Sequence, residues 1–542
     1  MTASKTVLLW FRSILLSTLA LFFITLSWGQ PTALHDSISI RKVMDIGSST
    51  ATRIDIDPAT NELYYATVSG DIFKVNIGAG NATKIFDNGD HGLDEVYGFE
   101  IGGSGNIYLV SMVNGAANNI AMVKKYDGAV WTTMVTANYP RSSRDHRFNA
   151  VIETPDQQHI LVNSGARTDH GELKSNSQRE NAFTAKLLKF PVDTANLTLQ
   201  DNEVFMEDFI FATGLRNTYD IEYDSTGLLF GLDQADQSDR QEELNWIQEG
   251  KHYGFPWMIG PNENLMQYPN YNPPSSDPLV TSVNMESTFH NDPNFPPKPG
   301  VPLISPVMSH GPDQDLFRDT VDSQIKDASD INRKMGTFTP HSSPVGLTFD
   351  TQNALPQEFK GKAFSLSWSN TNDRKFKPFN QIGEDLLMIE LEKVGNNYEA
   401  NITRIALGFN HPVDAAILGD KMYVIEHADN GVLWEVDFGT ENTTGFSSQN
   451  LTEESGLKIF PNAFNDQVSI SLTIEKTGEG FVRIYSLEGK LIHTLWEGTY
   501  LQPTQLTWDG TTEDGRKVPN GIYLVEVSVN GKRTYARVIK SD

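Results

Sequence analysis

The clearest pattern in the chain is a repeated pair of alternating segments. Apolar and polar residues alternate, a turn rich in Asp, Asn or Gly follows, and a second alternating segment completes the unit. Alternation with a period of two, bounded by turn residues, is typical of antiparallel strands with one buried face. The pattern occurs in residues 53–66, 98–110, 149–162, 219–231, 345–368 and 413–425.

Six strand-rich repeats without helical stretches between them favour a β-propeller. A single sheet of this kind cannot bury its own face, so such sheets stack around a common axis. Six blades of about 40 to 50 residues each would account for most of residues 35–440. We therefore predict an all-β chain with a six-bladed propeller over 35–440. A pair of β-sandwiches is the alternative, and it fits the uneven spacing of the repeats less well.

A different module follows a polar segment. Residues 441–456 are small and polar and are predicted to be a linker. Residues 457–542 alternate again, with Glu-Gly, Asp-Gly and Asn-Gly turns, which predicts a small β-sandwich of about seven strands.

This module resembles the C-terminal sorting domain of type IX secretion cargo from the Bacteroidetes group. The motifs behind the likeness are Phe460-Pro461-Asn462, Trp508-Asp509-Gly510, Asp514-Gly515 and Asn520-Gly521-Ile522-Tyr523. The resemblance implies type IX secretion machinery as a partner. An ordinary carbohydrate-binding sandwich is the alternative.

The first 29 residues have the pattern of an export signal. Lys5 and Arg12 precede an apolar run over 14–26, and small residues stand before Gln30. A bilayer needs about 20 apolar residues, so this run is short for a membrane span. We predict a signal peptide over 1–29 and a secreted or cell-surface protein without a transmembrane segment. An uncleaved anchor is the alternative.

Composition narrows the chemistry. The 542 residues include 69 acidic and 43 basic side chains, for a net charge of -26. Such acidity argues against nucleic acid as a partner, because that binding needs clustered Lys and Arg. The absence of cysteine excludes disulfides, thiolate metal ligands and a cysteine nucleophile.

Three polar segments beside the predicted strands carry the candidate chemistry. Asp145-His146 precedes the third repeat, where an imidazole can act as a base and a neighbouring carboxylate can orient it. Arg216-Asn217 precedes the fourth repeat, and a permanent planar cation suits an oxyanion or a carboxylate. Residues 233–246 are rich in carboxylates and amides, the oxygen ligands that Ca²⁺ prefers. Solvated polar pairs and an acidic surface loop are the ordinary alternatives.

The order and spacing of these segments resemble the soluble quinoprotein glucose/sorbosone dehydrogenases, six-bladed propellers that use pyrroloquinoline quinone (PQQ) and calcium. The likeness covers about residues 40–438. It rests on Asp145-His146, Gly214-x-Arg216-Asn217, Glu242-Glu243-Leu244-Asn245-Trp246-Ile247 and Gly250-x-x-Tyr253-Gly254-x-Pro256. It implies a PQQ-dependent sugar dehydrogenase that oxidises the anomeric hydroxyl of an aldose or related sugar.

The resemblance also implies a role for each residue. His146 would remove the proton of the anomeric hydroxyl, Asp145 would orient it, and Arg216 would face the quinone carbonyl. These roles require His146 and Arg216 to lie over one basin. Asn217 and Gln234 would flank the cofactor. The candidates near the calcium ion are Glu242, Glu243 and the backbone oxygens of Ala235, Asp236 and Tyr253.

The chain departs from the family where two arginines hold the carboxylates of the quinone. Asn410, His411 and Val413 stand there instead. A basic cluster, Arg374, Lys375 and Lys377, is the predicted substitute, with a solvated loop as the alternative. Because unpaired buried carboxylates are costly, two other functions stay open. They are a calcium-dependent lactonase-like hydrolase and a non-catalytic glycan-binding propeller.

Overall fold

The structure is a computed structural model of the chain. It describes residues 30–541 except 48–49, 116–117, 142–145, 175–177, 268–276, 282, 284–291, 371, 440–456, 462–463, 473–477, 488, 501–503 and 531. The predicted signal peptide and linker and the candidate residue Asp145 lie outside the described residues.

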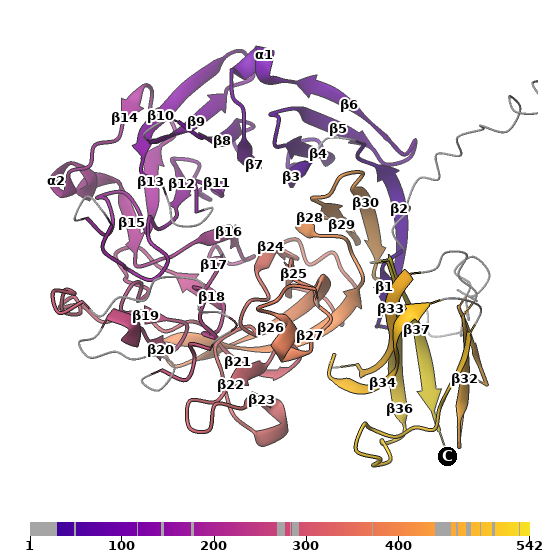
Figure 1. Cartoon of the computed structure of the whole chain (residues 1–542). Helices are drawn as coiled ribbons and strands as arrows, with labels where there is room; N and C mark the ends of the chain where they lie inside the picture. The colour runs from indigo at the N-terminus through magenta and orange to yellow at the C-terminus, as the bar shows by residue number, and fades with distance from the viewer. Residues whose placement is uncertain are drawn as a thin grey trace, which may run out of the picture.

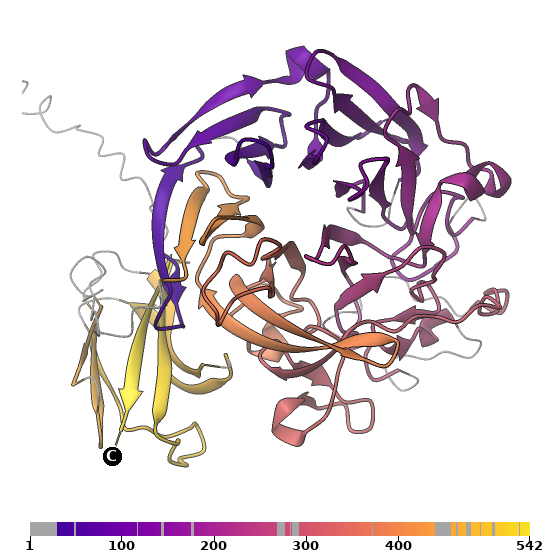
Figure 2. The ribbon, with the colours of Figure 1, turned by 180° about the vertical axis from the view of Figure 1, so that it is seen from behind.

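Six antiparallel sheets stand around a common axis in the described residues, which confirms the predicted propeller (Figures 1 and 2). The first three blades are β3 (Ala51–Asp57), β4 (Glu62–Thr67), β5 (Ile72–Asn76) and β6 (Asn81–Phe86); β7 (Val96–Ile101), β8 (Ile107–Val113), β9 (Asn119–Tyr126) and β10 (Trp131–Tyr139); and β11 (Val151–Glu153), β12 (His159–Ser164), β13 (Lys186–Pro191) and β15 (Ile210–Thr213). The last three are β16 (Thr218–Tyr223), β17 (Leu229–Asp233) and β18 (Glu243–Ile247); β24 (Pro344–Phe349), β25 (Ala363–Ser367), β26 (Asp385–Val394) and β27 (Asn397–Leu407); and β28 (Pro412–Leu418), β29 (Lys421–Glu426), β30 (Val432–Asp437) and β2 (Ser39–Asp45).

The ring is closed by a strand from the start of the propeller. β2 pairs antiparallel with β30, so the last blade contains both ends of the propeller segment. Arg41 and Glu435 form an ion pair across this junction, with Nη2 and Oε2 2.6 Å apart. Closure of this kind leaves no open edge between the first and last blades.

Neighbouring blades are also joined at their innermost strands. An aspartate accepts a hydrogen bond from a backbone N–H of the next inner strand along the ring, which ties the blades together near the axis. The three bridges are Asp55 Oδ2 to Ile101 N (2.6 Å), Asp220 Oδ2 to Leu347 N (2.7 Å) and Asp414 Oδ2 to Ile54 N (3.0 Å).

Short elements lie in the connections. Three strands extend blades, namely β1 (Thr32–Ala33) and β21 (Met308–Pro312) beside β27 and β14 (Leu197–Thr198) beside β10. The others are β19 (Met258–Ile259), β20 (Asn262–Glu263), β22 (Leu316–Arg318), β23 (Ile325–Asp327), α1 (Asn88–His91), α2 (Glu203–Met206), η1 (Glu207–Phe209), η2 (Leu265–Gln267), η3 (Ser329–Ile331) and η4 (Lys377–Phe379). Among the described residues, no helix has the length and apolar character needed to cross a bilayer.

The C-terminal module is a β-sandwich, as predicted. One sheet contains β31 (Leu457–Phe460), β32 (Val468–Leu472) and β35 (Thr504–Trp508), and the other contains β33 (Gly478–Ser486), β34 (Leu491–Tyr500), β36 (Gly521–Val529) and β37 (Lys532–Lys540). Alternate side chains of the two sheets meet in a core that includes Ile470, Val482, Trp508 and Val525.

Candidate functional site

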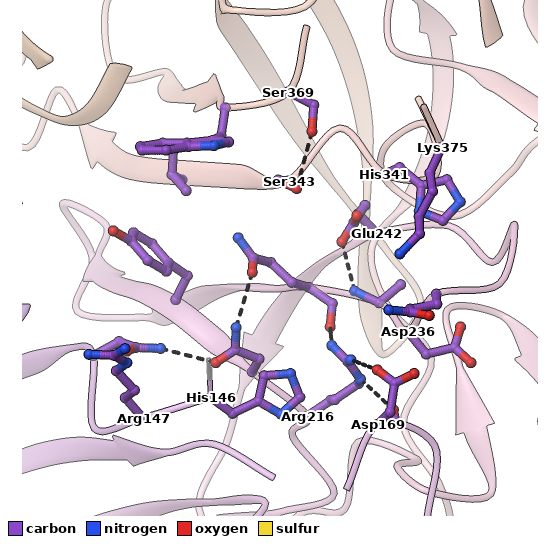
Figure 3. Close-up of a pocket in the computed structure, with 18 of the residues that line it drawn as sticks. His146, Arg147, Asp169, Arg216, Asp236, Glu242, His341, Ser343, Ser369 and Lys375 are labelled. Carbon is purple, nitrogen blue, oxygen red and sulfur yellow. Dashed lines mark hydrogen bonds and ion pairs between the residues drawn. The ribbon is translucent and has the colours of Figure 1, made fainter. Parts of the chain in front are cut away.

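A pocket of about 540 Å³ lies where the ends of the inner strands meet, and Figure 3 shows its lining. The volume is within the range of small-molecule sites. All six blades contribute, because every inner strand ends at the axis. The lining includes Thr52, Tyr97, His146, Arg147, Asn149, Asp169, Arg216, Asn217, Tyr219, Gln234, Ala235, Asp236, Glu242, His341, Ser343, Trp368, Ser369, Asp373, Lys375 and His427.

His146 is held as a neutral imidazole in this pocket. It is 3% exposed, and its Nδ1 lies 2.8 Å from the carbonyl oxygen of Ala166. A carbonyl can only accept, so Nδ1 carries the proton and Nε2 is left as an acceptor. Burial, and then the positive charge of Arg216, lowers the pKa of His146 to about 3. The ring therefore stays neutral at ordinary pH, with Nε2 unprotonated.

Arg216 lies in the same pocket, so the predicted convergence with His146 is confirmed. Its Nε donates to the carbonyl of Asp169 at 2.7 Å, Nη2 donates to Asp169 Oδ1 at 2.5 Å, and Nη1 donates to the carbonyl of Gln234 at 2.7 Å. These contacts use three of the five N–H donors of a guanidinium. The side chain is thus fixed in place and still has donors for a ligand.

A row of amides joins the third and fourth blades in the same pocket. Asn149 Nδ2 donates to Asn217 Oδ1 and Asn217 Nδ2 donates to Gln234 Oε1, both at 3.0 Å. Both predicted cofactor neighbours, Asn217 and Gln234, line the pocket. Their orientation is set before any ligand binds.

The five predicted calcium candidates do not form one site. Glu242, Ala235 and Asp236 line the pocket, whereas Glu243 and Tyr253 do not. Successive residues of a strand point to opposite faces, and Glu243 therefore turns away to accept a hydrogen bond from Gly260 N at 2.6 Å. The hydroxyl of Tyr253 donates to the carbonyl of Trp246 at 2.7 Å. These two residues therefore lie outside the lining of the pocket, and their role near an ion stays a prediction.

The remaining three candidates offer oxygen ligands. Glu242 accepts a hydrogen bond from Ala235 N at 2.7 Å, and burial raises the pKa of Glu242 to about 7. Asp236 Oδ2 is buried and has no hydrogen-bond partner in the described part of the chain, the kind of oxygen that a hard cation takes. No group of three or more His, Asp or Glu side chains within the described ranges is arranged to hold a metal ion. Calcium stays a prediction.

The predicted basic cluster is only partly at the site. Lys375 lines the pocket, but Arg374 and Lys377 are exposed and lie outside the lining. The turn that holds these residues buries Phe376 and Phe379 in the core, so its basic side chains point in different directions. Asn410, His411 and Val413 also lie outside the lining.

Arg147 and His341 are among the basic residues of the pocket that sequence reasoning missed. Arg147 lies 4.2 Å above the ring centre of Tyr97 and pairs with Glu95, with Nη1 and Oε2 3.3 Å apart. His341 Nε2 lies 3.0 Å from Asp239 Oδ1. The sequence signal that pointed to His146 was a polar segment just before an inner strand. The same signal could have found both residues, since Arg147 is the neighbour of His146 and His341 also precedes an inner strand.

The residues present fit PQQ, a planar tricarboxylate. Arg147, Arg216 and Lys375 supply positive charge, and Trp368 adds a flat apolar surface to the lining. Cations on the wall offset the cost of burying the carboxylates. The pocket also holds carboxylates of its own, among them Asp169, which is already paired with Arg216.

Comparison with known proteins gave matches to solved structures and to family models. Three similar solved structures each share 13% sequence identity with this chain. The PQQ-bound aldose sugar dehydrogenase of Streptomyces coelicolor has a TM-score of 0.43 and covers 75% of this chain and 99% of its own. The apo soluble aldose sugar dehydrogenase of Escherichia coli has a TM-score of 0.45 and covers 74% and 99%. The holo PQQ domain of pyranose dehydrogenase from Coprinopsis cinerea has a TM-score of 0.47 and covers 75% and 97%. No curated protein matches this chain.

Two family models match parts of the chain. Residues 462–532 match the FlgD Ig-like domain, which agrees with the sandwich and leaves the predicted sorting role untested. Residues 78–280 match Glucose / Sorbosone dehydrogenase, and this range contains His146, Arg216 and the 233–246 loop.

Proposed function

We propose that this protein is a PQQ-dependent dehydrogenase that oxidises the anomeric hydroxyl of an aldose or related sugar. One observation carries the proposal: a neutral, buried His146 and a fixed Arg216 line one pocket within the range that matches Glucose / Sorbosone dehydrogenase. The cations and the flat surface of Trp368 support a planar anionic cofactor in that pocket.

In this proposal His146 is the base. Its Nε2 takes the proton of the anomeric hydroxyl, because the Ala166 carbonyl keeps the proton of the ring on Nδ1. The remaining donors of Arg216 stabilise negative charge that develops on an oxygen above them. A positioned base is worth about 10² to 10⁴ in rate.

Other pocket residues would hold the cofactor. Arg147 and Lys375 would pair with the carboxylates of PQQ, and Asn217 and Gln234 would contact its edge. When bound, PQQ supplies the acceptor for the two electrons of the oxidation. Calcium would take oxygens from Asp236 and Glu242.

We also propose that the protein is secreted or held at the cell surface. The support is the pattern of residues 1–29 and the likeness of 457–542 to type IX sorting domains. Detection of the protein in culture medium or on intact cells, and its loss after deletion of 457–542, would test this.

The experiment for the enzymatic proposal is a titration of the purified protein with PQQ in calcium, followed by dye reduction with aldoses. The wild type should bind PQQ saturably and reduce dye. His146→Ala should still bind PQQ but lose at least about 100-fold in turnover, whereas Arg216→Ala should lose both turnover and affinity. Exposed Lys377→Ala is the matched control and should behave as the wild type.

Two outcomes would contradict the proposal. A protein that neither binds PQQ nor cleaves a lactone in a calcium-dependent way, but does bind glycans, would favour a glycan-binding propeller. Calcium-dependent hydrolysis of a lactone without PQQ binding would favour the hydrolase.

A further inference from the structure

The C-terminal sandwich is packed against the propeller through an apolar contact. Leu34, Ile382 and Leu407 of the propeller form one buried cluster with Tyr485 and Leu524 of the sandwich. Figure 1 shows the sandwich beside β1 and the outer strands of the ring. The two modules therefore share a small core of their own.

The fit at this contact is close. A Cβ on Gly408 would lie 2.9 Å from the ring of Tyr535, and a Cβ on Gly489 would lie 2.4 Å from Nη1 of Arg404. Arg404 is itself held in the propeller by Asp385 and Asp313. Such close approach from both sides favours one docked position.

One buried charge of the sandwich reaches a loop of the propeller. Arg533, on β37, is 8% exposed. Its Nη2 donates to Asn370 Oδ1 at 3.3 Å, and its Nη1 lies 3.9 Å from Glu384 Oε2. Asn370 and Glu384 stand on the two stems of the loop between β25 and β26, joined to each other by a hydrogen bond of 3.0 Å.

The same loop forms a wall of the pocket. Ser369, Asp373 and Lys375 line the cavity, and a backbone hydrogen bond of 2.9 Å from Glu384 N to the Ser369 carbonyl closes the base of the loop. Arg533 thus holds the loop at its base, while the tip of the loop carries Lys375 into the site.

Glu384 makes a second connection to the pocket. It accepts a hydrogen bond from the backbone N–H of His411 at 3.2 Å. The His411 ring packs edge-on against Trp368 at 4.8 Å between ring centres, and Trp368 lines the pocket. Glu384, the carboxylate paired with Arg533, therefore supports Trp368 in the pocket wall as well as the loop between β25 and β26.

From these contacts we infer that the sandwich is a fixed buttress of the pocket and that Arg533 is a positioning residue. It acts through Asn370 and Glu384 to hold the 369–384 loop, and it lies outside the lining of the pocket. The effect on kinetics rests on the proposed function; the effect on the loop does not.

The test measures hydrogen exchange of the 369–384 segment in the full chain. Arg533→Ala should speed exchange there by about tenfold or more, because a buried carboxylate loses its partner. Arg533→Lys should restore part of the protection. Arg537→Ala is the matched control, since Arg537 lies on the same strand and pairs with the exposed Asp36 at 2.9 Å. It should leave the loop unchanged.

Kinetics give the second readout. Arg533→Ala should raise the KM for sugar several-fold with kcat within about twofold, a split that general destabilisation would not produce. If Arg533→Ala does not fold, Asn370→Ala removes the hydrogen bond between Asn370 and Arg533 from the propeller side. Unchanged exchange of the loop in a folded variant would overturn the inference. Faster exchange in a protein that oxidises no sugar would support the inference and reject the proposed function.

Discussion

Among single residues, His146 shows best how burial prepares a side chain for chemistry. It is almost completely buried, and the charge of Arg216 acts against its protonation. Both effects disfavour the imidazolium, so the ring stays neutral far below the ordinary pKa of histidine. The Ala166 carbonyl then selects the tautomer.

We predict that His146 does not titrate between pH 5 and 8 in the protein without cofactor, since its pKa is lowered to about 3. The measurement is the ¹³Cε1 shift of labelled histidines, with His146→Gln to assign the signal. A shift change centred near pH 6.5 would contradict the account.

The site residues differ in how far the sequence could predict them. His146, Arg216, Asn217 and Gln234 stand at fixed positions before or after inner strands, where the period of the pattern places them at the axis. Glu243 lies outside the lining because a shift of one residue in a strand turns the side chain to the opposite face. Arg374 and Lys377 lie outside the lining because a turn has no such period to set the directions of its side chains.

Among the elements, the inner strands carry acidic groups close to the axis. Burial raises the pKa of Asp55 to about 7 and raises the pKa values of Glu100, Glu222 and Asp414 well above their ordinary range. Arg53 lies among them and donates to the carbonyl of Tyr219 at 2.6 Å. Between the ordinary pKa of a carboxyl group and the raised one, these side chains are therefore protonated in the folded propeller and ionised in the unfolded chain.

We predict that these groups make the propeller less stable as the pH rises. The contribution of each of these groups to the free energy of unfolding is fully present below about pH 4. It is lost as the pH rises through the pKa of the group in the folded protein, by up to about 1.4 kcal/mol per pH unit for each group. The measurement is urea unfolding of the wild type and Glu222→Gln from pH 5 to 8. The wild type should lose stability relative to the variant across this range. A difference that stays constant or grows in favour of the wild type would contradict the account.

The strands and their pairing within each repeat were largely predictable, but the long-range pairing that closes the ring was not. All six repeats coincide with the first two strands of a blade, because alternation is a local property. The pairing of the closing strand β2 was not predicted, because its partner β30 lies far away in the chain. Arg41 and Glu435, one on each strand, are 394 positions apart. No local pattern marks such a partner.

For the whole molecule, the division into a propeller and a sandwich was predictable from the change in pattern at 441–456. The docking of the two modules was not, because Arg533 occupies an ordinary position in an alternating strand. Only the fold brings it to Asn370 and Glu384. The structure therefore adds a connection between the sandwich and the pocket.

The most direct test of the central claim is anaerobic mixing of the PQQ-loaded protein with a series of aldoses while the absorbance of the quinone is followed. We predict that at least one aldose changes the spectrum of the wild type within a single turnover. His146→Gln, which keeps the size and polarity of the site, should slow that change at least about 100-fold. A spectrum that no aldose alters, or an equal rate in His146→Gln, would contradict the claim.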